Sequence, residues 1–296
     1  MRIALATCAA VPAQFDDDEL LAEALRERGA RAEFVEWDDA SADWQRFDRV
    51  VIRSTWDYTQ RLGDYLDWID RVDGRLRNQP ELVRWNSDKR YVADLAKAGL
   101  PVVATQFVEP GEEIGDLSGE VAIKPTVSAG GRDTGRFGPR AHDSGRELIE
   151  QIVADGRTAM VQPYLAAVDS EGETALIFIA GELAHVLHKR AVLAPDEVAP
   201  IRDDSLGAAE AMYDPTLVTA GTAADDQIEL GRRVVAWLAE RFGASPLIAR
   251  VDTVRDTSGS PVVLELEAVE PNLYLRQAPQ TAEILADAIV AELAVR

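Results

Sequence analysis

The 296-residue sequence contains one cysteine, three histidines and three methionines, and its 31 Lys and Arg residues are outnumbered by 52 Asp and Glu. The single cysteine, Cys8, excludes an internal disulfide framework and a zinc site built from cysteines. The shortage of basic residues leaves a formal net charge of -21, which argues against a general binder of nucleic acid or anionic membranes. No run reaches the roughly 18 apolar residues needed to cross a bilayer. We therefore expect a cytoplasmic protein that has neither nucleic acid nor a membrane as partner.

The sequence does have the composition of a globular protein, with 47% apolar and 28% charged residues. In its first part, short apolar runs at residues 2–8, 32–37 and 49–53 alternate with stretches in which leucines recur at helical spacing. This alternation predicts an open parallel sheet covered by helices on both faces. Ligands of such sheets bind at the carboxyl ends of the strands, which here include residues 53–58.

The pattern of elements changes twice along the chain, and we expect three units at residues 1–86, 87–165 and 166–296. A linker is predicted at residues 78–85. The long polar stretch at residues 193–225 is expected to be a partly ordered excursion, of a kind that often serves as a lid.

The strongest group of chemically active residues lies in a hairpin predicted near the C-terminus. Its strands, residues 247–254 and 262–267, place Asp252 close to opposite Glu265, and Glu267 shares a face with Glu265 because side chains alternate along a strand. Three carboxylates on one surface repel one another unless they share a cation. Oxygen ligands without nearby His or Cys favour Mg²⁺ or Mn²⁺. The alternative interpretation is the solvated face of a hairpin in an acidic protein.

A second group combines a lysine with a glycine-rich loop. Lys124 lies at the end of a predicted strand, and the loop that follows at residues 128–134 contains Gly130 and Gly131. Backbone amides of such a loop can hold phosphate oxygens while the ammonium offsets their charge. The spacing is not that of a Walker A loop, and an ordinary mobile turn is the alternative.

A third group lies near residue 165, where the central unit meets the C-terminal one. Gln162, Tyr164 and Leu165 are candidates for a hinge that binds adenine, and Asp169, which follows them, is a candidate for a carboxylate that binds ribose. A plain linker between domains is the alternative.

Taken in order, these segments resemble the ATP-grasp superfamily of carboxylate ligases. The resemblance covers the whole chain and is strongest from residue 89 to 267. It implies an open parallel α/β domain followed by a small central and a larger C-terminal α+β domain, which hold ATP between them. Residues that match the nucleotide-binding positions are Lys89, Lys124, Ser128, Gly130, Gly131, Gln162, Tyr164, Leu165 and Asp169.

The resemblance also implies a metal site and a catalytic group. Asp252, Glu265 and Glu267 match the magnesium ligands, although the family usually has Asn at the last position. Arg250 matches an arginine aimed at the transferred phosphoryl group. A further basic residue facing the γ-phosphate is expected at Lys189 or Arg190, without a choice between them.

Within the superfamily, residues 53–58 and 270–274 resemble a narrower group of ligases. This group includes the cyclo-ligase of antibiotic biosynthesis that forms cycloserine from O-ureido-D-serine. The resemblance implies a small amino-acid-like substrate, whose carboxylate is activated by ATP as an acyl phosphate and is then attacked by a nitrogen of the same molecule. Expected substrate contacts are Arg53, Ser54, Thr55, Asp57 and Asn272.

Several alternatives remain open at this point. A turn at a strand end, next to a capped helix, would explain residues 53–58 without a substrate. An intermolecular acid–amine ligase, a nucleotide-binding module without ligase activity and a kinase acting on a hydroxyl would each retain the same nucleotide-binding residues.

Overall fold

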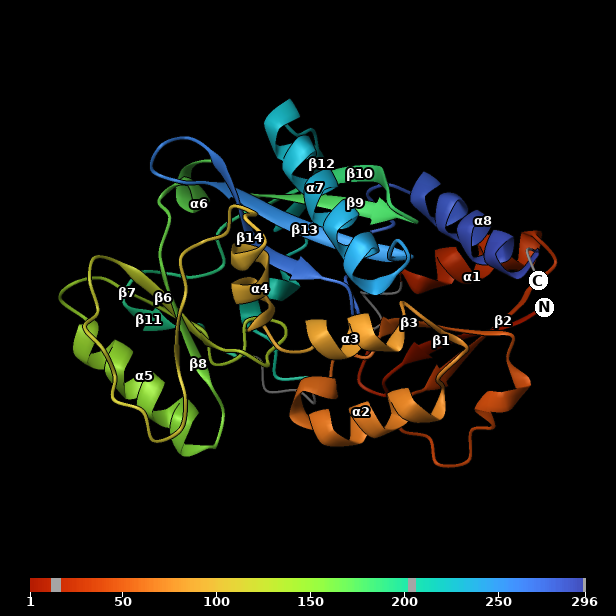
Figure 1. Cartoon of the computed structure of the whole chain (residues 1–296), viewed down its shortest axis with the longest axis horizontal. Coiled ribbons are helices and arrows are strands. Elements are labelled where there is room, and N and C mark those ends of the chain that lie inside the picture. The colour runs from red at the N-terminus through yellow and green to blue at the C-terminus, as the bar shows by residue number, and fades with distance from the viewer. Residues whose placement is uncertain (12–16, 202–205, 295–296) are drawn as a thin grey trace.

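The computed structural model describes residues 1–11, 17–201 and 206–294, which form three β-sheets with helices packed around them (Figure 1). The helices are α1 (Asp18–Glu27), α2 (Leu62–Arg71), α3 (Pro80–Asn86), α4 (Tyr91–Lys97), α5 (His142–Ala154), α6 (Ala167–Ser170), α7 (Asp225–Phe242) and α8 (Gln280–Ala294). The strands are β1 (Arg2–Thr7), β2 (Arg31–Glu36), β3 (Arg49–Ser54), β4 (Leu76–Arg77), β5 (Gln106–Val108), β6 (Val121–Pro125), β7 (Gly135–Phe137), β8 (Ala159–Pro163), β9 (Glu173–Ile179), β10 (Glu182–Lys189), β11 (Glu197–Val198), β12 (Val218–Gly221), β13 (Ile248–Arg255) and β14 (Pro261–Glu267).

The N-terminal sheet has the strand order β2-β1-β3-β4, and all of its pairs are parallel. Its two central strands are apolar on both faces because helices or other elements cover each face. This part of the fold confirms the open parallel α/β unit predicted from the alternating pattern. The carboxyl ends of β1 and β3 lie together, since the hydroxyls of Thr7 and Ser54 are 2.8 Å apart.

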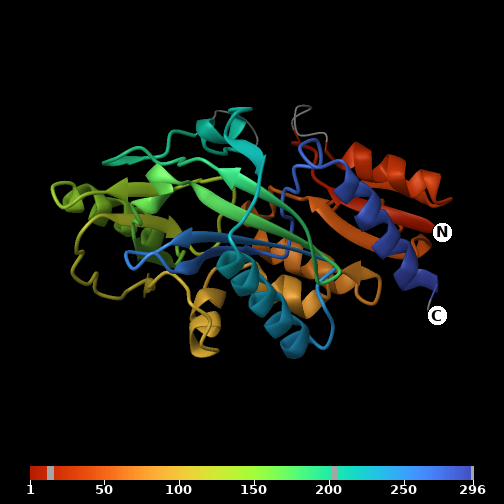
Figure 2. The ribbon, with the colours of Figure 1, turned by 90° about the horizontal axis from the view of Figure 1, so that it is seen from above.

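The other two sheets are mainly antiparallel. The central sheet has the order β11-β7-β6-β8-β5, and α5 packs against it. The C-terminal sheet has the order β12-β10-β9-β13-β14. Figure 2 shows the central and N-terminal sheets at opposite ends of the molecule with the C-terminal sheet between them. Within the described ranges, no helix is long and apolar enough to span a membrane.

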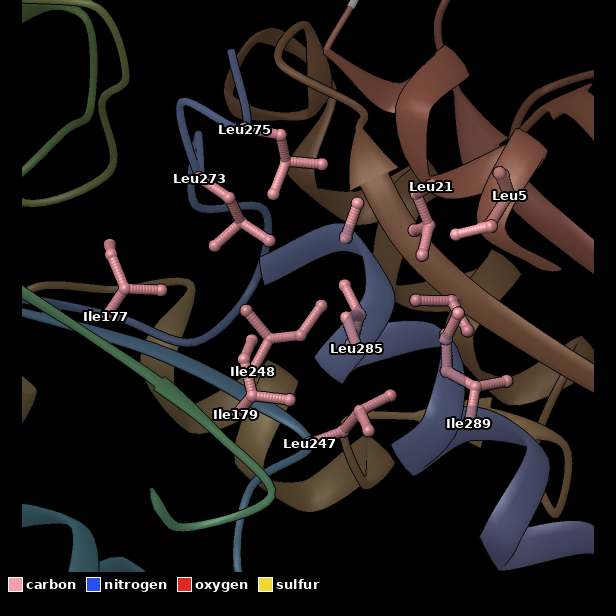
Figure 3. Close-up of a cluster of buried hydrophobic side chains, with 14 of the residues drawn as sticks. Leu5, Leu21, Ile177, Ile179, Leu247, Ile248, Leu273, Leu275, Leu285 and Ile289 are labelled. Atoms are coloured by element: carbon pink, nitrogen blue, oxygen red, sulfur yellow. The ribbon is translucent and has the colours of Figure 1, made fainter. Parts of the chain in front are cut away.

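Helix α8, at the C-terminal end of the chain, packs against the N-terminal elements. Leu285 and Ile289 on α8 pack in one buried cluster with Leu21 of α1 and Leu5 of β1 (Figure 3). The same cluster contains Ile248 and further residues of the C-terminal sheet. Burial of apolar side chains contributes about 1.5–3 kcal/mol each, so this shared core fixes the N-terminal sheet against the C-terminal one.

One prediction about local structure is wrong. Residues 80–86 form helix α3 instead of a linker, and the amides of Asn78 and Asn86 bond to buried backbone groups of β13 and of the β14 region. These hydrogen bonds join segments far apart in the sequence, so no local pattern indicates them.

The division into residues 1–86, 87–165 and 166–296 stays a prediction. Two segments pack across it: Tyr91 and Leu95 of α4 lie in the core of the C-terminal sheet, and β11 pairs with β7 of the central sheet. The excursion at residues 193–225 contains β11, β12 and a 3₁₀ turn at Glu210–Tyr213, and residues 202–205 within it lie outside the described ones.

His185 on β10 has a structural role that predicts how stability depends on pH. Its Nε2 lies 3.0 Å from the carbonyl oxygen of Leu273 and its Nδ1 lies 2.8 Å from the hydroxyl of Thr281, so a neutral ring donates to the first and accepts from the second. Burial lowers the pKa of His185 to about 4, although the Leu273 carbonyl opposes the shift. The unfolded chain, with an ordinary pKa near 6.5, therefore takes up a proton that the folded chain does not.

We expect the free energy of unfolding to fall as the pH drops from 7.5 to 5, because His185 protonates only in the unfolded chain. This residue should contribute about 2 kcal/mol to the decrease. Urea unfolding of wild type and of His185→Gln at both pH values measures this contribution. The other titrating groups affect both proteins equally, so they cancel when the pH dependence of one protein is subtracted from that of the other. An equal pH dependence in the two proteins would contradict the assignment.

Candidate active site

A cavity of about 270 Å³ lies where the three sheets meet. It is lined from the central sheet by Lys124 and Gln162, from the C-terminal sheet by Arg250 and Glu265, and from the N-terminal part by Trp56. The basic residues of the middle of the chain and the acidic residues near its end therefore converge on one space. The sequence-predicted residues that line it are Lys89, Lys124, Ser128, Gly130, Gly131, Gln162, Tyr164, Leu165, Lys189, Arg250, Glu265, Glu267 and Asn272.

Glu265 connects the two lysines expected to contact phosphates. Its carboxylate lies 3.4 Å from Lys89 Nζ and 3.5 Å from Lys124 Nζ, although the lysines come from different parts of the chain. Burial opposes the charge of Glu265, but the two ammonium groups outweigh it and hold the pKa of this carboxyl well below its usual range. Lys89 also donates to the backbone oxygen of Ser128, at the start of the glycine-rich loop. Two ammonium groups facing one cavity suit a polyphosphate.

The glycine-rich loop needs its glycines for two reasons. Gly130 and Gly131 have φ values of +64° and +74°, a conformation that other residues rarely adopt. A Cβ atom on Gly130 would lie 2.8 Å from the Cβ of Ala208. The amide of Ala209 donates to the carbonyl oxygen of Gly130 at 2.7 Å. The loop is thus closed against the segment after residue 205.

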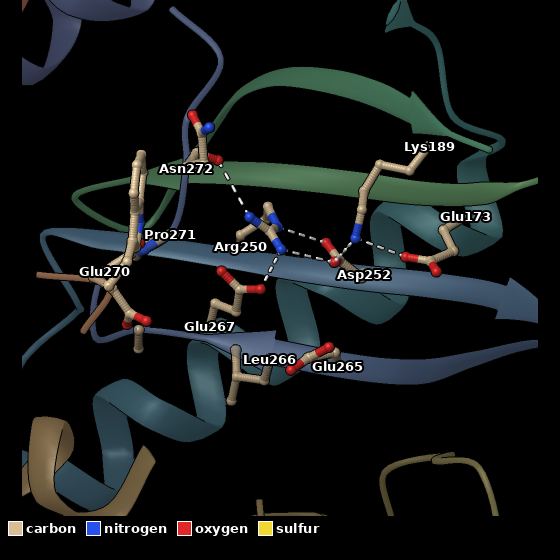
Figure 4. A network of polar contacts seen from close by, with 12 residues as sticks. Glu173, Lys189, Arg250, Asp252, Glu265, Leu266, Glu267, Glu270, Pro271 and Asn272 are labelled. Atoms are coloured by element: carbon tan, nitrogen blue, oxygen red, sulfur yellow. Dashed lines mark hydrogen bonds and ion pairs between the residues drawn. The ribbon is translucent and has the colours of Figure 1, made fainter. Parts of the chain in front are cut away.

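The predicted hairpin carries a chain of ion pairs (Figure 4). Asp252 lies directly opposite Glu265 in the register of β13 and β14, as predicted. Arg250 donates to both oxygens of Asp252, at 2.9 and 3.1 Å, and also to Glu267. Lys189 donates to Asp252 and to Glu173, both at 2.8 Å. The side chains of Arg250 and Lys189 are held by carboxylates on both sides and point into the cavity.

The crowding of carboxylates raises the pKa of the outer ones. Burial, together with the charges of Glu265 and Asp252, raises the pKa of Glu267 to about 7 despite the nearby Arg250. Burial and the charge of Glu267 raise the pKa of Glu270 to about 8. Asp252 is fully buried, but Arg250 and Lys189 hold the pKa of its carboxyl below the usual value.

The expected magnesium ligands contact cationic side chains, and their role toward a metal stays a prediction. In the part of the chain that the structure describes, no group of three or more His, Cys, Asp or Glu side chains is placed to hold a metal ion. The cations shared by Asp252, Glu265 and Glu267 are side chains: Arg250 and three lysines. Glu265 and Glu267 line the cavity with oxygen donors of the type that Mg²⁺ prefers, whereas Asp252 has no exposed surface.

The expected adenine hinge lies on β8 and just after it. Gln162 is buried and donates to the hydroxyl of Thr105 at 2.9 Å, and Tyr164 and Leu165 face the cavity. Asp169 does not line the cavity. It accepts two hydrogen bonds from Arg136, at 2.9 and 2.8 Å, and one from Tyr164 at 2.7 Å. Its role toward a ribose stays a prediction.

The structure distinguishes between Lys189 and Arg190. Successive side chains of a strand point to opposite faces. Lys189 is buried and lines the cavity, whereas Arg190 is exposed and pairs with Asp214 and Thr216 outside it. The catalytic role suggested for Arg190 is therefore not supported by its position.

Four expected substrate contacts lie outside the cavity, which corrects the prediction for residues 53–58. Thr55 has no exposed surface and bonds to Tyr65, and Ser54 bonds to Thr7. Asp57 accepts hydrogen bonds from Trp37 and Arg61. The physical reason is that β3 ends at Ser54 and the chain then turns into a 3₁₀ helix, and Trp56 and Tyr58 of the same segment face the cavity instead.

Arg53, the fourth of these residues, supports the site from behind. It is buried, pairs with Asp18 at 2.8 Å, and donates at 3.4 Å to the carbonyl oxygen of Pro271. Pro271 lies between Glu270 and Asn272, both of which line the cavity. Arg53 thus fixes the backbone of a cavity wall without touching the space inside.

Sequence reasoning missed Trp56, Tyr58, Glu173, Glu270 and Tyr274, which also line the cavity. A signal for Glu270 was present, since an acidic residue stands directly before Pro271 in a segment otherwise poor in charge.

Comparisons with known proteins agree with this arrangement. The family described as D-cycloserine synthetase DcsG, N-terminal domain, matches residues 3–78. The cycloserine biosynthesis protein DcsG of Streptomyces lavendulae is 35% identical to the chain, with 98% of each sequence covered. The chain belongs to the DcsG family. A crystal structure of D-cycloserine synthetase DcsG superposes with a TM-score of 0.87 at 33% identity, covering 99% of this chain and 100% of the other.

More distant structures place this family in the ATP-grasp fold. A D-alanine–D-alanine ligase of Bacillus anthracis in complex with ATP has a TM-score of 0.66 at 12% identity, covering 100% of this chain and 98% of the other. The predicted resemblance to ATP-grasp ligases and the predicted fold class are confirmed. The chain is an ATP-dependent ligase with the fold of ATP-binding enzymes.

Proposed function

We propose that the chain converts O-ureido-D-serine to D-cycloserine, using ATP and Mg²⁺. The observation that carries the proposal is the convergence of Lys89, Lys124, Lys189 and Arg250 on one cavity that Glu270 and Asn272 also line. The relatives named as cycloserine-forming proteins match the chain over nearly its whole length, which supports the same substrate class. A reaction that consumes ATP also fits the cytoplasmic location expected from the sequence.

The proposed reaction has three steps. A carboxylate oxygen of the substrate attacks the γ-phosphorus of ATP, and ADP leaves, which gives an acyl phosphate. The nitrogen bonded to the substrate's side-chain oxygen then attacks the acyl carbon, phosphate leaves, and a five-membered ring closes. In a further step water attacks the carbamoyl carbon, the bond from that carbon to the ring nitrogen breaks, the nitrogen takes up a proton, and the released carbamate breaks down to carbon dioxide and ammonia. Intramolecular attack of this kind gains up to roughly 7–11 kcal/mol from proximity.

The protein's part in the first step is positioning and charge neutralisation. Lys89 and Lys124 offset the charge of the phosphates, and the glycine-rich loop supplies backbone amides. Arg250 and Lys189 face the transferred phosphoryl group. Glu265 and Glu267 would hold Mg²⁺, which supplies further neutralisation of the phosphates when bound. Asp252 keeps Arg250 and Lys189 in place.

One assay tests the proposal against its alternatives. ADP release from ATP is measured with O-ureido-D-serine, or its L enantiomer, as the only other substrate. In a parallel reaction, hydroxylamine is added to trap an acyl phosphate as a hydroxamate. We expect ADP release and cycloserine when no amine is added, and a trapped hydroxamate when hydroxylamine is present. A requirement for a second amine would favour an intermolecular ligase, ADP release without a hydroxamate would favour a kinase, and nucleotide binding without turnover would favour a binding module.

A further inference from the structure

The charged side chains of the cavity form pairs, and one carboxylate is left over. Glu265 faces Lys89 and Lys124, and the carboxylates of Glu173, Asp252 and Glu267 share Lys189 and Arg250. Among the described residues, no side chain forms an ion pair or a hydrogen bond with the carboxylate of Glu270. Yet Glu270 lines the cavity and is only 9% exposed. Burial and the charge of Glu267 raise the pKa of such a carboxyl, and a ligand of opposite charge would offset the cost of burying it in the charged form.

The backbone around Glu270 is fixed, which keeps the side chain in place. The indole of Trp56 donates to the carbonyl oxygen of Glu270 at 3.4 Å, and Arg53 donates to that of Pro271. Figure 4 shows Glu265, Glu267 and Glu270 in a row along β14 and the segment after it. Glu265 is at the end that carries the phosphate-facing lysines, and Glu270 is at the opposite end beside Pro271 and Asn272.

The position of Glu270 in the cavity indicates which kind of cation would bind its carboxylate. A divalent metal that serves ATP belongs near the phosphates, where Glu265 and Glu267 lie. At the other end a single carboxylate, with the indole of Trp56 and the amide of Asn272 lining the same cavity, suits a primary ammonium, which has three donors and one charge. An amino-acid-like substrate carries this group next to the carboxylate to be activated.

We propose that Glu270 binds the α-ammonium group of the substrate and so orients its carboxylate toward Arg250 and the phosphoryl group. This inference rests on the proposed function. An ammonium held by Glu270 has no free electron pair, so it cannot act as a nucleophile toward the acyl phosphate of another molecule. The α-nitrogen is thereby kept from reacting, while attack by the nitrogen bonded to the side-chain oxygen closes the five-membered ring.

Substrate analogues test the inference together with Glu270→Gln, which keeps the size and removes the charge. ADP release is measured with O-ureido-D-serine and with 3-(ureidooxy)propanoate, which lacks only the α-amino group. We expect Glu270→Gln to lower kcat/KM for the amino compound by about 100-fold and to leave that of the desamino compound within about 3-fold, because loss of one partner of a buried charge pair has an effect of this order. KM for ATP should not change. Glu270→Asp should recover part of the loss.

Glu173→Gln is the matched control, because it removes a cavity carboxylate that is already paired with Lys189. This variant should affect both compounds equally. The same ratio between the two compounds in Glu270→Gln and wild type would overturn the role of Glu270 while leaving the proposed function intact. Absence of ADP release by wild type with O-ureidoserine of either configuration would instead overturn the proposed function and, with it, this inference.

Discussion

Replacement of Arg250 by lysine is expected to lower kcat by about 1,000-fold while the protein stays folded. An arginine that stabilises the charge of a transferred phosphoryl group contributes 10³–10⁵ to turnover. Lysine keeps the charge that Asp252 and Glu267 require, but it cannot make the forked contacts to both oxygens of Asp252 and to Glu267. Steady-state ADP release with saturating substrates measures the loss.

Two further variants separate catalysis from folding. Arg250→Met leaves the buried Asp252 and the half-buried Glu267 short of a partner and should lower the free energy of unfolding by about 3–5 kcal/mol, which a urea titration measures. Arg190→Lys changes an exposed arginine outside the cavity and should leave kcat within about 2-fold. A kcat of Arg250→Lys close to that of wild type would show that the guanidinium does not serve phosphoryl transfer.

Local patterns in the sequence predict much of this site. The hairpin itself follows from a short turn and the two-residue alternation of strands, which are local, but Asp252 lies opposite Glu265 because the ladder shifts by one residue between Asp252 and Thr253. The position of Lys124 at the end of β6, directly before the glycine-rich loop, is local in the same sense. Their meeting in one cavity was predicted only through the resemblance to ATP-grasp ligases, because no pattern fixes how the central and C-terminal sheets pack.

The errors arise where packing chooses between two faces. In residues 53–58 the polar side chains were expected to face the substrate, but Thr55 is buried within the N-terminal unit and Trp56 faces the cavity. The Trp56 indole meets a carbonyl oxygen of residue 270, more than 200 positions away. Asn86 likewise bonds to the backbone near β14. Which side chains of a segment face the cavity depends on contacts with residues far away in the sequence, and a short stretch of sequence does not reveal these contacts.

The N-terminal sheet therefore contributes mainly by support. Asp17 accepts hydrogen bonds from the amides of Leu275 and Arg276, at 2.8 and 3.3 Å, and Arg53 holds Pro271. These contacts fix the segment that carries Glu270 and follows β14. The resemblance at residues 53–58 therefore concerns the residues that support the cavity wall around Glu270. It says less about which groups contact the substrate.

Glu265→Gln should separate a metal-binding role of this carboxylate from a structural one. In the absence of a nucleotide, Glu265 neutralises Lys89 and Lys124, so the neutral amide frees both ammonium groups for phosphate. We therefore expect Glu265→Gln to bind ATP as tightly as wild type, or more tightly, when EDTA removes divalent ions. With Mg²⁺ present, the loss of a charged oxygen ligand should lower kcat by about 1,000-fold and raise the Mg²⁺ concentration needed for half-maximal activity.

The test compares the ATP affinity of Glu265→Gln with and without Mg²⁺. Calorimetric titration with ATP, in EDTA and in excess Mg²⁺, gives both affinities on one protein. Glu120→Gln is the control, since Glu120 pairs with Arg136 outside the cavity and its change should alter neither affinity. Equal weakening of ATP binding with and without Mg²⁺ would mean that Glu265 serves only to position the lysines, because a metal ligand acts only when the metal is there.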